Sequence, residues 1–148
     1  MPRGGTMNRS LGVKVCFLLI AVAVLAVLSS AQSKAQIERG KYLVVEVARC
    51  GDCHTPINEK GEPLQDRWLK GAVLPFKPTV TMPWAEQSVN IAGLPAGWKS
   101  QDAVTFLMTG KYQGQSPLPP MPEYHVTKED AEAMVAYLRS LASAAPKK

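Results

Sequence analysis

The sequence predicts an all-α domain with three main helices and long loops. Three segments, near residues 37–50, 98–112 and 127–141, carry apolar residues at helical spacing. The stretch between the first two contains six prolines and scattered glycines, which exclude a long helix or a central strand there. Little of the chain alternates apolar and polar residues as a half-buried strand would.

The first 31 of the 148 residues have the pattern of a secretory signal peptide. Three basic side chains precede an apolar run of 14 residues, 15–28, and small residues follow it. We expect cleavage after residue 31 or after residue 35. The alternative is an uncleaved membrane anchor, but a spanning helix needs roughly 20 apolar residues. Cys16 lies inside the run, so we expect it to be removed with the signal.

Loss of the signal leaves a chain with little net charge. Residues 1–31 hold three of the 17 basic side chains and none of the 12 acidic ones, so the charge falls from +5 to +2. That excess is too small to predict a nucleic-acid partner. No membrane span is expected after cleavage, and we expect a periplasmic protein. An uncleaved segment would instead anchor it to the periplasmic side of the membrane.

The first predicted helix starts near Ile37 and leads into a pair of cysteines. Its apolar residues at positions 37, 43, 44, 47 and 48 share one helical face. The segment that follows, residues 55–98, is long and without predicted helix or strand. Such segments are uncommon in compact domains unless they serve a function, so we expect this one to wrap something functional.

Two further helices are predicted after residue 98. Ser100 is expected to cap the second helix and Gly110 to end it, with an apolar face at positions 104, 107 and 108. Thr127 is expected to cap the third, and Asp130 completes a near capping box. A proline-stiffened loop, QGQSPLPPMPEYHV, joins them. Three short helices make a thin core, so a disulfide, metal or cofactor is expected as an added constraint.

Cys50, Cys53 and His54 form a C-x-x-C-H sequence, the pattern of covalent haem attachment. Cysteines three apart on a helical turn present both sulfurs to one side, where they can bond the two vinyl groups of a haem. The histidine that follows then lies under the iron as the proximal ligand.

Three other interpretations of the motif are weaker. A thioredoxin-like dithiol would have a βαβ context, which is absent. A zinc site needs four ligands, and only His125 remains to join these three residues. A disulfide between residues three apart closes a small loop and constrains little.

Over residues 36–142 the chain resembles a class I cytochrome c. GKYLVVEVARCGDCHTP resembles the family's first helix and attachment site, and PPMP followed by TKEDAEAMVAYLRSL resembles its methionine loop and last helix. The resemblance implies a small cytochrome c fold wrapped round one haem c, bound through Cys50 and Cys53, with residues 143–148 as a flexible tail. The sequence is similar to single-haem bacterial cytochromes and to cytochrome subunits of periplasmic dehydrogenases.

The resemblance also implies two packing contacts. The first and last helices of the family cross, with a glycine meeting an aromatic residue, and Gly40 and Tyr137 match these positions. A backbone carbonyl, usually of a proline after the attachment histidine, accepts the imidazole N–H in the family. Pro63 is the match for that proline in this chain.

Met121 is the predicted sixth iron ligand. Pro120 and Pro122 flank it and stiffen its loop, and it lies just before the last helix, where the family's distal methionine falls. Met82, His125 or an open site are the alternatives. The two other methionines after the signal lie on apolar helical faces, where methionine is more often core.

These residues predict an exported monohaem c-type cytochrome that carries single electrons and is not itself an enzyme. Its expected partners are redox proteins: a dehydrogenase, an oxidase or a reductase. The alternatives are an electron-transfer subunit of a periplasmic dehydrogenase complex and a ligand-binding or peroxidatic haem protein with an open sixth site. Aromatic side chains are expected to wall the haem, namely Trp68, Trp84, Trp98, Tyr112 and Tyr124.

Overall fold

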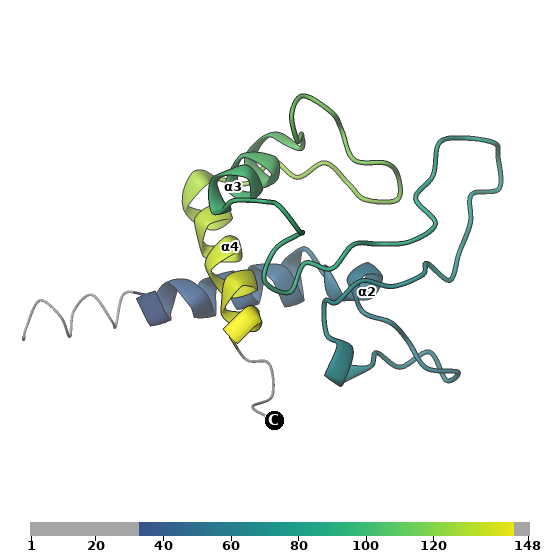
Figure 1. Cartoon of the computed structure of the whole chain (residues 1–148), viewed down its shortest axis with the longest axis horizontal. Coiled ribbons are helices and arrows are strands. Elements are labelled where there is room, and N and C mark those ends of the chain that lie inside the picture. The colour runs from purple at the N-terminus through teal and green to yellow at the C-terminus, as the bar shows by residue number, and fades with distance from the viewer. Residues whose placement is uncertain (1–32, 144–148) are drawn as a thin grey trace, which may run out of the picture. The chain divides into compact units, whose positions relative to one another are not determined.

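The computed structural model describes residues 33–143, which form helices and long loops (Figure 1). An α-helix over residues 33–42 continues into a π-helical turn, η1 (Leu43–Val47). The short helix α2 (Gly51–His54) and the 3-10 turn η2 (Gln65–Arg67) follow, and then α3 (Ser100–Thr109) and α4 (Lys128–Ser143). Three isolated bridges and no sheet occur within the described residues, so the predicted all-α class with three main helices is confirmed.

The predicted signal peptide, residues 1–31, lies outside the described residues, as does the predicted tail beyond α4. The boundaries of the domain therefore stay predictions. Within residues 33–143, no helix combines the length and apolar character that crossing a membrane requires.

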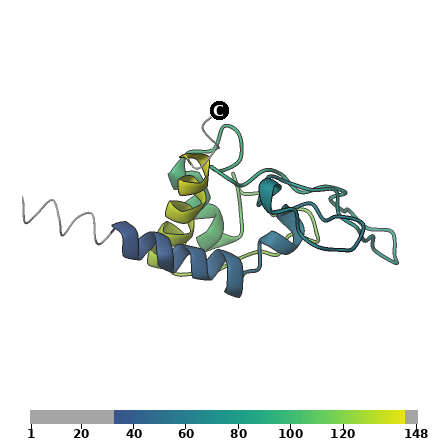
Figure 2. The same cartoon turned by 90° about the horizontal axis from the view of Figure 1, so that it is seen from below.

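The N-terminal helix crosses α4 at Gly40 (Figure 2). A Cβ at residue 40 would clash with the backbone carbonyl of Ala133, so only glycine permits this approach. Tyr137 lies one turn further along α4 and is 8% exposed. The predicted crossing is confirmed for Gly40, although its nearest contact is the backbone of Ala133 rather than the ring of Tyr137.

Helices α3 and α4 pack together over one hydrophobic core. Each fully buried aliphatic side chain contributes about 1.5–3 kcal/mol through loss of water contact. The twelve buried members are Leu43, Val44, Leu69, Leu94, Ala103, Val104, Leu107, Ala131, Met134, Val135, Tyr137 and Leu138.

Local signals set the ends of α3 and α4. Gly110 ends α3 with φ +71°, and the hydroxyl of Thr127 accepts the N–H of Asp130 at 3.2 Å, so both predictions are confirmed. The predicted cap at Ser100 is wrong by one residue. The N-cap is Lys99, whose N–H donates to the carboxylate of Asp102 at 2.8 Å.

The loop from residue 55 to residue 98 folds back on itself around Leu69, which is fully buried. The N–H of Leu69 donates to the hydroxyl of Thr55 at 3.0 Å. Its carbonyl accepts the N–H groups of Ile91 and Ala92 at 2.9 and 3.1 Å. Leu69 therefore joins the start of the loop to its last third. An antiparallel bridge between Val73 and Gln87 closes the long arm between them.

Candidate haem site

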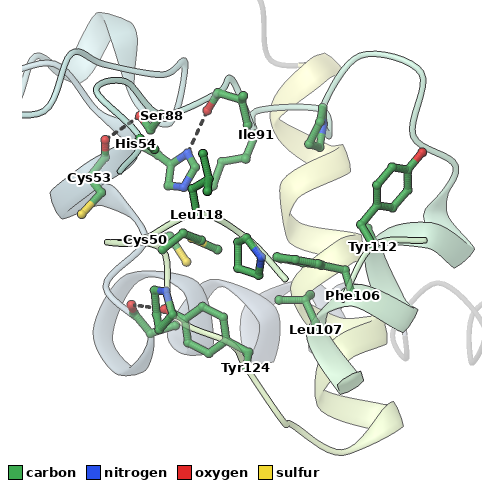
Figure 3. A pocket seen from close by; sticks show the side chains of 18 of the residues that line it. Cys50, Cys53, His54, Ser88, Ile91, Phe106, Leu107, Tyr112, Leu118 and Tyr124 are labelled. Atoms are coloured by element: carbon green, nitrogen blue, oxygen red, sulfur yellow. Dashed lines mark hydrogen bonds between the residues drawn. The ribbon is translucent and has the colours of Figure 1, made fainter. Parts of the chain in front are cut away.

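A cavity of about 640 Å³ lies between α2, the end of the long loop, α3 and the loop after α3 (Figure 3). Its volume is within the roughly 300–1,000 Å³ typical of cofactor-sized pockets. Most of its lining is apolar. The four predicted site residues, Cys50, Cys53, His54 and Met121, all line it.

Both cysteines of the attachment turn line this cavity. Cys50 precedes α2 and Cys53 lies within it, and the two thiols form no disulfide. Burial raises the pKa of Cys50 to about 11 and also raises the pKa of Cys53. Redox-active dithiols need the opposite shift, toward the thiolate. Of the residues that the structure describes, no three His, Cys, Asp or Glu side chains form a group that could hold a metal ion.

Trp68 supports the attachment turn from behind. A Cβ on Gly51 would clash with the six-membered ring of Trp68, so glycine lets the turn lie directly against the indole. The indole N–H points toward the core and donates to the hydroxyl of Tyr137 at 3.4 Å. Trp68 is not part of the cavity lining, so its predicted role as a haem wall is wrong.

His54 is buried and already oriented. It is 6% exposed, and its Nδ1 lies 2.8 Å from the carbonyl oxygen of Val89 (Figure 3). A carbonyl can only accept, so Nδ1 carries the proton and Nε2 is the nitrogen with the free lone pair. Burial lowers the pKa of His54, which favours the neutral imidazole that binds metals.

The predicted acceptor for His54, the carbonyl of Pro63, is wrong. Pro63 pairs with Ile57 in an isolated bridge at the start of the long loop. The acceptor is Val89, 35 residues after the histidine, because the loop turns back at Leu69 and returns past the imidazole. No side-chain signal could have identified it, since every residue carries a backbone carbonyl.

Ser88 ties the part of the loop that contains Val89 to the attachment turn. Its hydroxyl donates to the carbonyl of Cys53 at 2.6 Å and accepts the N–H of Ala72 at 2.9 Å. The N–H of Gly71 donates to the carbonyl of His54 at 2.8 Å. The last two carbonyls of α2 are thus both paired with the loop. Nothing in the sequence around Ser88 marks it for this role.

Met121 lies on the loop after α3 and lines the cavity. The two other candidates for the sixth ligand, Met82 and His125, do not line it. The N–H of Met121 donates to the carbonyl of Leu118 at 3.2 Å. Met82 is 41% exposed on the long loop and does not line the cavity. The side chain of His125 is 65% exposed and lies 3.9 Å from the carboxylate of Glu123.

The aromatic wall differs in part from the prediction. Trp98 stacks on Tyr112 with ring centroids 4.2 Å apart, and both line the cavity, as does Tyr124. Phe106, which the sequence analysis missed, also lines it and meets Trp98 edge to face at 5.3 Å. Trp84 does not line the cavity, which contradicts its predicted place in the wall.

The residues present fit a haem. Two thiols and an oriented imidazole stand on one wall, and a thioether stands on the loop that forms another part of the lining. The indole N–H of Trp84 is buried and no described residue accepts it, but Trp84 lies outside the cavity lining, so this donor does not bear on the fit.

Comparison with known proteins gives the same family. Residues 37–142 match the sequence model of the cytochrome c family. The fructose dehydrogenase cytochrome subunit of Gluconobacter japonicus is 36% identical over 113 residues, which are 70% of this chain and 21% of that protein. A diheme cytochrome c-type protein of Cereibacter sphaeroides is 32% identical over 108 residues, 69% of this chain and 34% of that protein.

The alcohol dehydrogenase (quinone) cytochrome c subunit of Gluconacetobacter polyoxogenes is 30% identical over 123 residues, 75% of this chain and 25% of that protein. The chain thus spans between a fifth and a third of the length of these relatives. Cys50, Cys53 and His54 form the haem c attachment motif, and the helical fold around them agrees with the family match. The chain belongs to the cytochrome c family.

Proposed function

We propose that this protein is an exported one-electron carrier in which Cys50 and Cys53 would hold a single haem and His54 and Met121 would ligate its iron. A bound haem supplies the one-electron couple between ferric and ferrous iron. The observation that carries the proposal is that all four residues line one cavity, while Met82 and the exposed His125 lie outside it.

His54 would act as the proximal ligand through Nε2. The hydrogen bond from Nδ1 to the Val89 carbonyl fixes the ring orientation and the tautomer, and it increases the donor strength of the other nitrogen. Ser88 and Gly71 hold the backbone of the same turn. The chain therefore supplies a preoriented ligand, so little reorganisation is needed on binding or during electron transfer.

Met121 would act as the distal ligand through its thioether sulfur. A thioether stabilises ferrous relative to ferric iron, so methionine ligation raises the reduction potential compared with a second histidine. Pro120 and Pro122 restrict the backbone on either side of the sulfur-bearing residue. The restriction lowers the entropy lost when the loop becomes ordered.

The apolar lining excludes water from the site, and low polarity around an iron centre is one of the ways in which a protein sets its potential. If His54 and Met121 both ligate the iron of the bound haem, no position would remain there for a substrate. The role that follows is electron transfer rather than catalysis.

The proposed partners are redox proteins, and among them a dehydrogenase is favoured, since two of the relatives are named as cytochrome subunits of dehydrogenases. The protein would act either as a free carrier or as a bound subunit of such a complex. Co-purification of a tagged chain from its native periplasm distinguishes these: a flavin, molybdenum or quinone enzyme retained in stoichiometric amount shows a subunit. Export itself is tested by the mass of the purified protein, which should lack residues 1–31 or 1–35.

Carbon monoxide tests the closed site. The purified holoprotein should be reduced reversibly by one electron and, once reduced, should bind no carbon monoxide near neutral pH. Binding of carbon monoxide to the native reduced protein would instead show an open sixth position, as in a ligand-binding or peroxidatic haem protein, and would refute the proposed carrier.

A further inference from the structure

The methionine loop, residues 115–126, is fastened to the rest of the molecule on both sides of Met121. Before it, the carbonyl of Pro119 accepts the N–H of Ala85 at 2.8 Å. After it, the hydroxyl of Tyr124 donates to the carbonyl of Ala48 at 3.0 Å (Figure 3). Between Met121 and Tyr124, both Pro122 and Glu123 are exposed. The Tyr124 bond is therefore the first tertiary hydrogen bond that the loop makes after its methionine.

The acceptor of this bond, the carbonyl of Ala48, lies next to the haem attachment motif. Ala48 ends the π-helical turn η1 and stands two residues before Cys50, and both line the cavity. The π-helical turn is closed by the N–H of Ala48, which donates to the carbonyl of Leu43 at 2.8 Å. The Tyr124 hydroxyl thus joins the loop that carries Met121 directly to the segment that carries the attachment cysteines, 76 residues away.

The bond remains available across the ordinary pH range. Tyr124 is half-buried, and burial is the main reason why its pKa is raised to about 12. The hydroxyl therefore keeps its proton and stays a donor. The next tertiary contact of the loop is the N–H of Val126, which donates to the carbonyl of Leu107 at 3.2 Å. Loss of the Tyr124 bond would lengthen the unfastened part of the loop after Met121 from two residues to four.

We propose that Tyr124 is a positioning residue for the distal ligand: its hydroxyl holds the methionine loop against Ala48 and so keeps the Met121 sulfur at the iron in competition with external ligands. The inference rests on the proposed function, because it requires Met121 to be the ligand. The Tyr124 hydroxyl does not itself ligate the iron, but it would determine how readily an external ligand displaces the Met121 sulfur.

Tyr137 provides a matched control. It is buried, and its hydroxyl also takes part in one hydrogen bond, to the indole of Trp68 at 3.4 Å. That bond lies behind the attachment turn, and neither residue lines the cavity. Tyr124→Phe and Tyr137→Phe therefore remove the same atom from the same kind of side chain, but only the first touches the methionine loop.

The test is a titration of the ferric holoprotein with imidazole, which displaces a methionine ligand and removes its near-infrared charge-transfer band. A hydrogen bond of ordinary net strength corresponds to about a two- to tenfold change in an equilibrium constant. Tyr124→Phe should raise the apparent affinity for imidazole by about that factor. Tyr137→Phe should leave the affinity unchanged while lowering the denaturant midpoint, which separates local loosening from a general loss of stability.

Three results distinguish failure of the inference from failure of the proposed function. Loss of the band in Met121→Ala, with a selective effect of Tyr124→Phe, supports the inference. Loss of the band in Met121→Ala, with equal imidazole affinities for wild type and Tyr124→Phe or equal shifts in both tyrosine variants, overturns the inference alone. A band that survives in Met121→Ala overturns the proposed ligand and the inference together.

Discussion

Leu69→Ala tests whether Leu69 anchors the long loop, from which the carbonyl of Val89 reaches His54. Leu69 is fully buried in the core, and its carbonyl accepts the N–H groups of Ile91 and Ala92, two and three residues after Val89. Truncation of a buried leucine to alanine costs about 2–5 kcal/mol, because apolar contact is lost and a cavity remains. With no exposed surface at this residue, we expect a loss of ~3 kcal/mol.

The loss of stability in Leu69→Ala can be measured by thermal and by chemical unfolding. For a domain of this size it corresponds to a decrease of roughly 10–20 °C in the melting temperature. Equilibrium unfolding of the holoprotein in guanidinium chloride, followed by circular dichroism, gives the free energy directly. The matched control is Val80→Ala on the same loop, where the side chain is 66% exposed and a change within about 0.5 kcal/mol is expected. A loss below 1 kcal/mol for Leu69→Ala would refute the role of Leu69 as the anchor of the loop.

The remaining predictions concern attachment, helix packing and the methionine loop. Cys50→Ala with Cys53→Ala should yield protein without covalent haem, seen as loss of haem stain after denaturing electrophoresis; stain that persists would show that the motif was misinterpreted. Gly40→Ala should lower the free energy of unfolding by about 1–3 kcal/mol, because the new methyl group meets the backbone of α4. Since alanine favours a helix by about 1 kcal/mol over glycine, a stabilised variant would contradict the close crossing. Pro122→Gly should weaken methionine ligation less than Met121→Ala does, measured by imidazole affinity, because it loosens the loop and keeps the sulfur.

Signals close together in the sequence predicted their part of the structure well. The C-x-x-C-H spacing places two thiols and an imidazole on one short turn, and the chemistry of those side chains restricts what the turn can bind. Gly110 and Thr127 mark helix ends because their conformational and hydrogen-bonding properties act within one turn. Met121 could be chosen over Met82 because prolines and the following helix are visible in the sequence.

Contacts between distant segments were predicted less well. The acceptor for His54 is a backbone carbonyl, which leaves no mark in the residue type. Aromatic side chains carry no sign of which surface they face, so Trp68 and Trp84 were expected in a wall that Phe106 helps to form. The π-helical turn at Leu43–Val47 is only five residues long, which is too short for the apolar pattern to distinguish it from the α-helix that it continues.

The ligand set is the central claim, and the near-infrared spectrum of the ferric holoprotein tests it most directly. A thioether bound to ferric haem gives a weak charge-transfer band that histidine or water in the same position does not give. The band should be present in the wild type and in Met82→Ala and absent in Met121→Ala, and Met121→Ala should also have a lower reduction potential. A band and potential that persist in Met121→Ala but disappear in Met82→Ala would contradict the account and make Met82 the ligand.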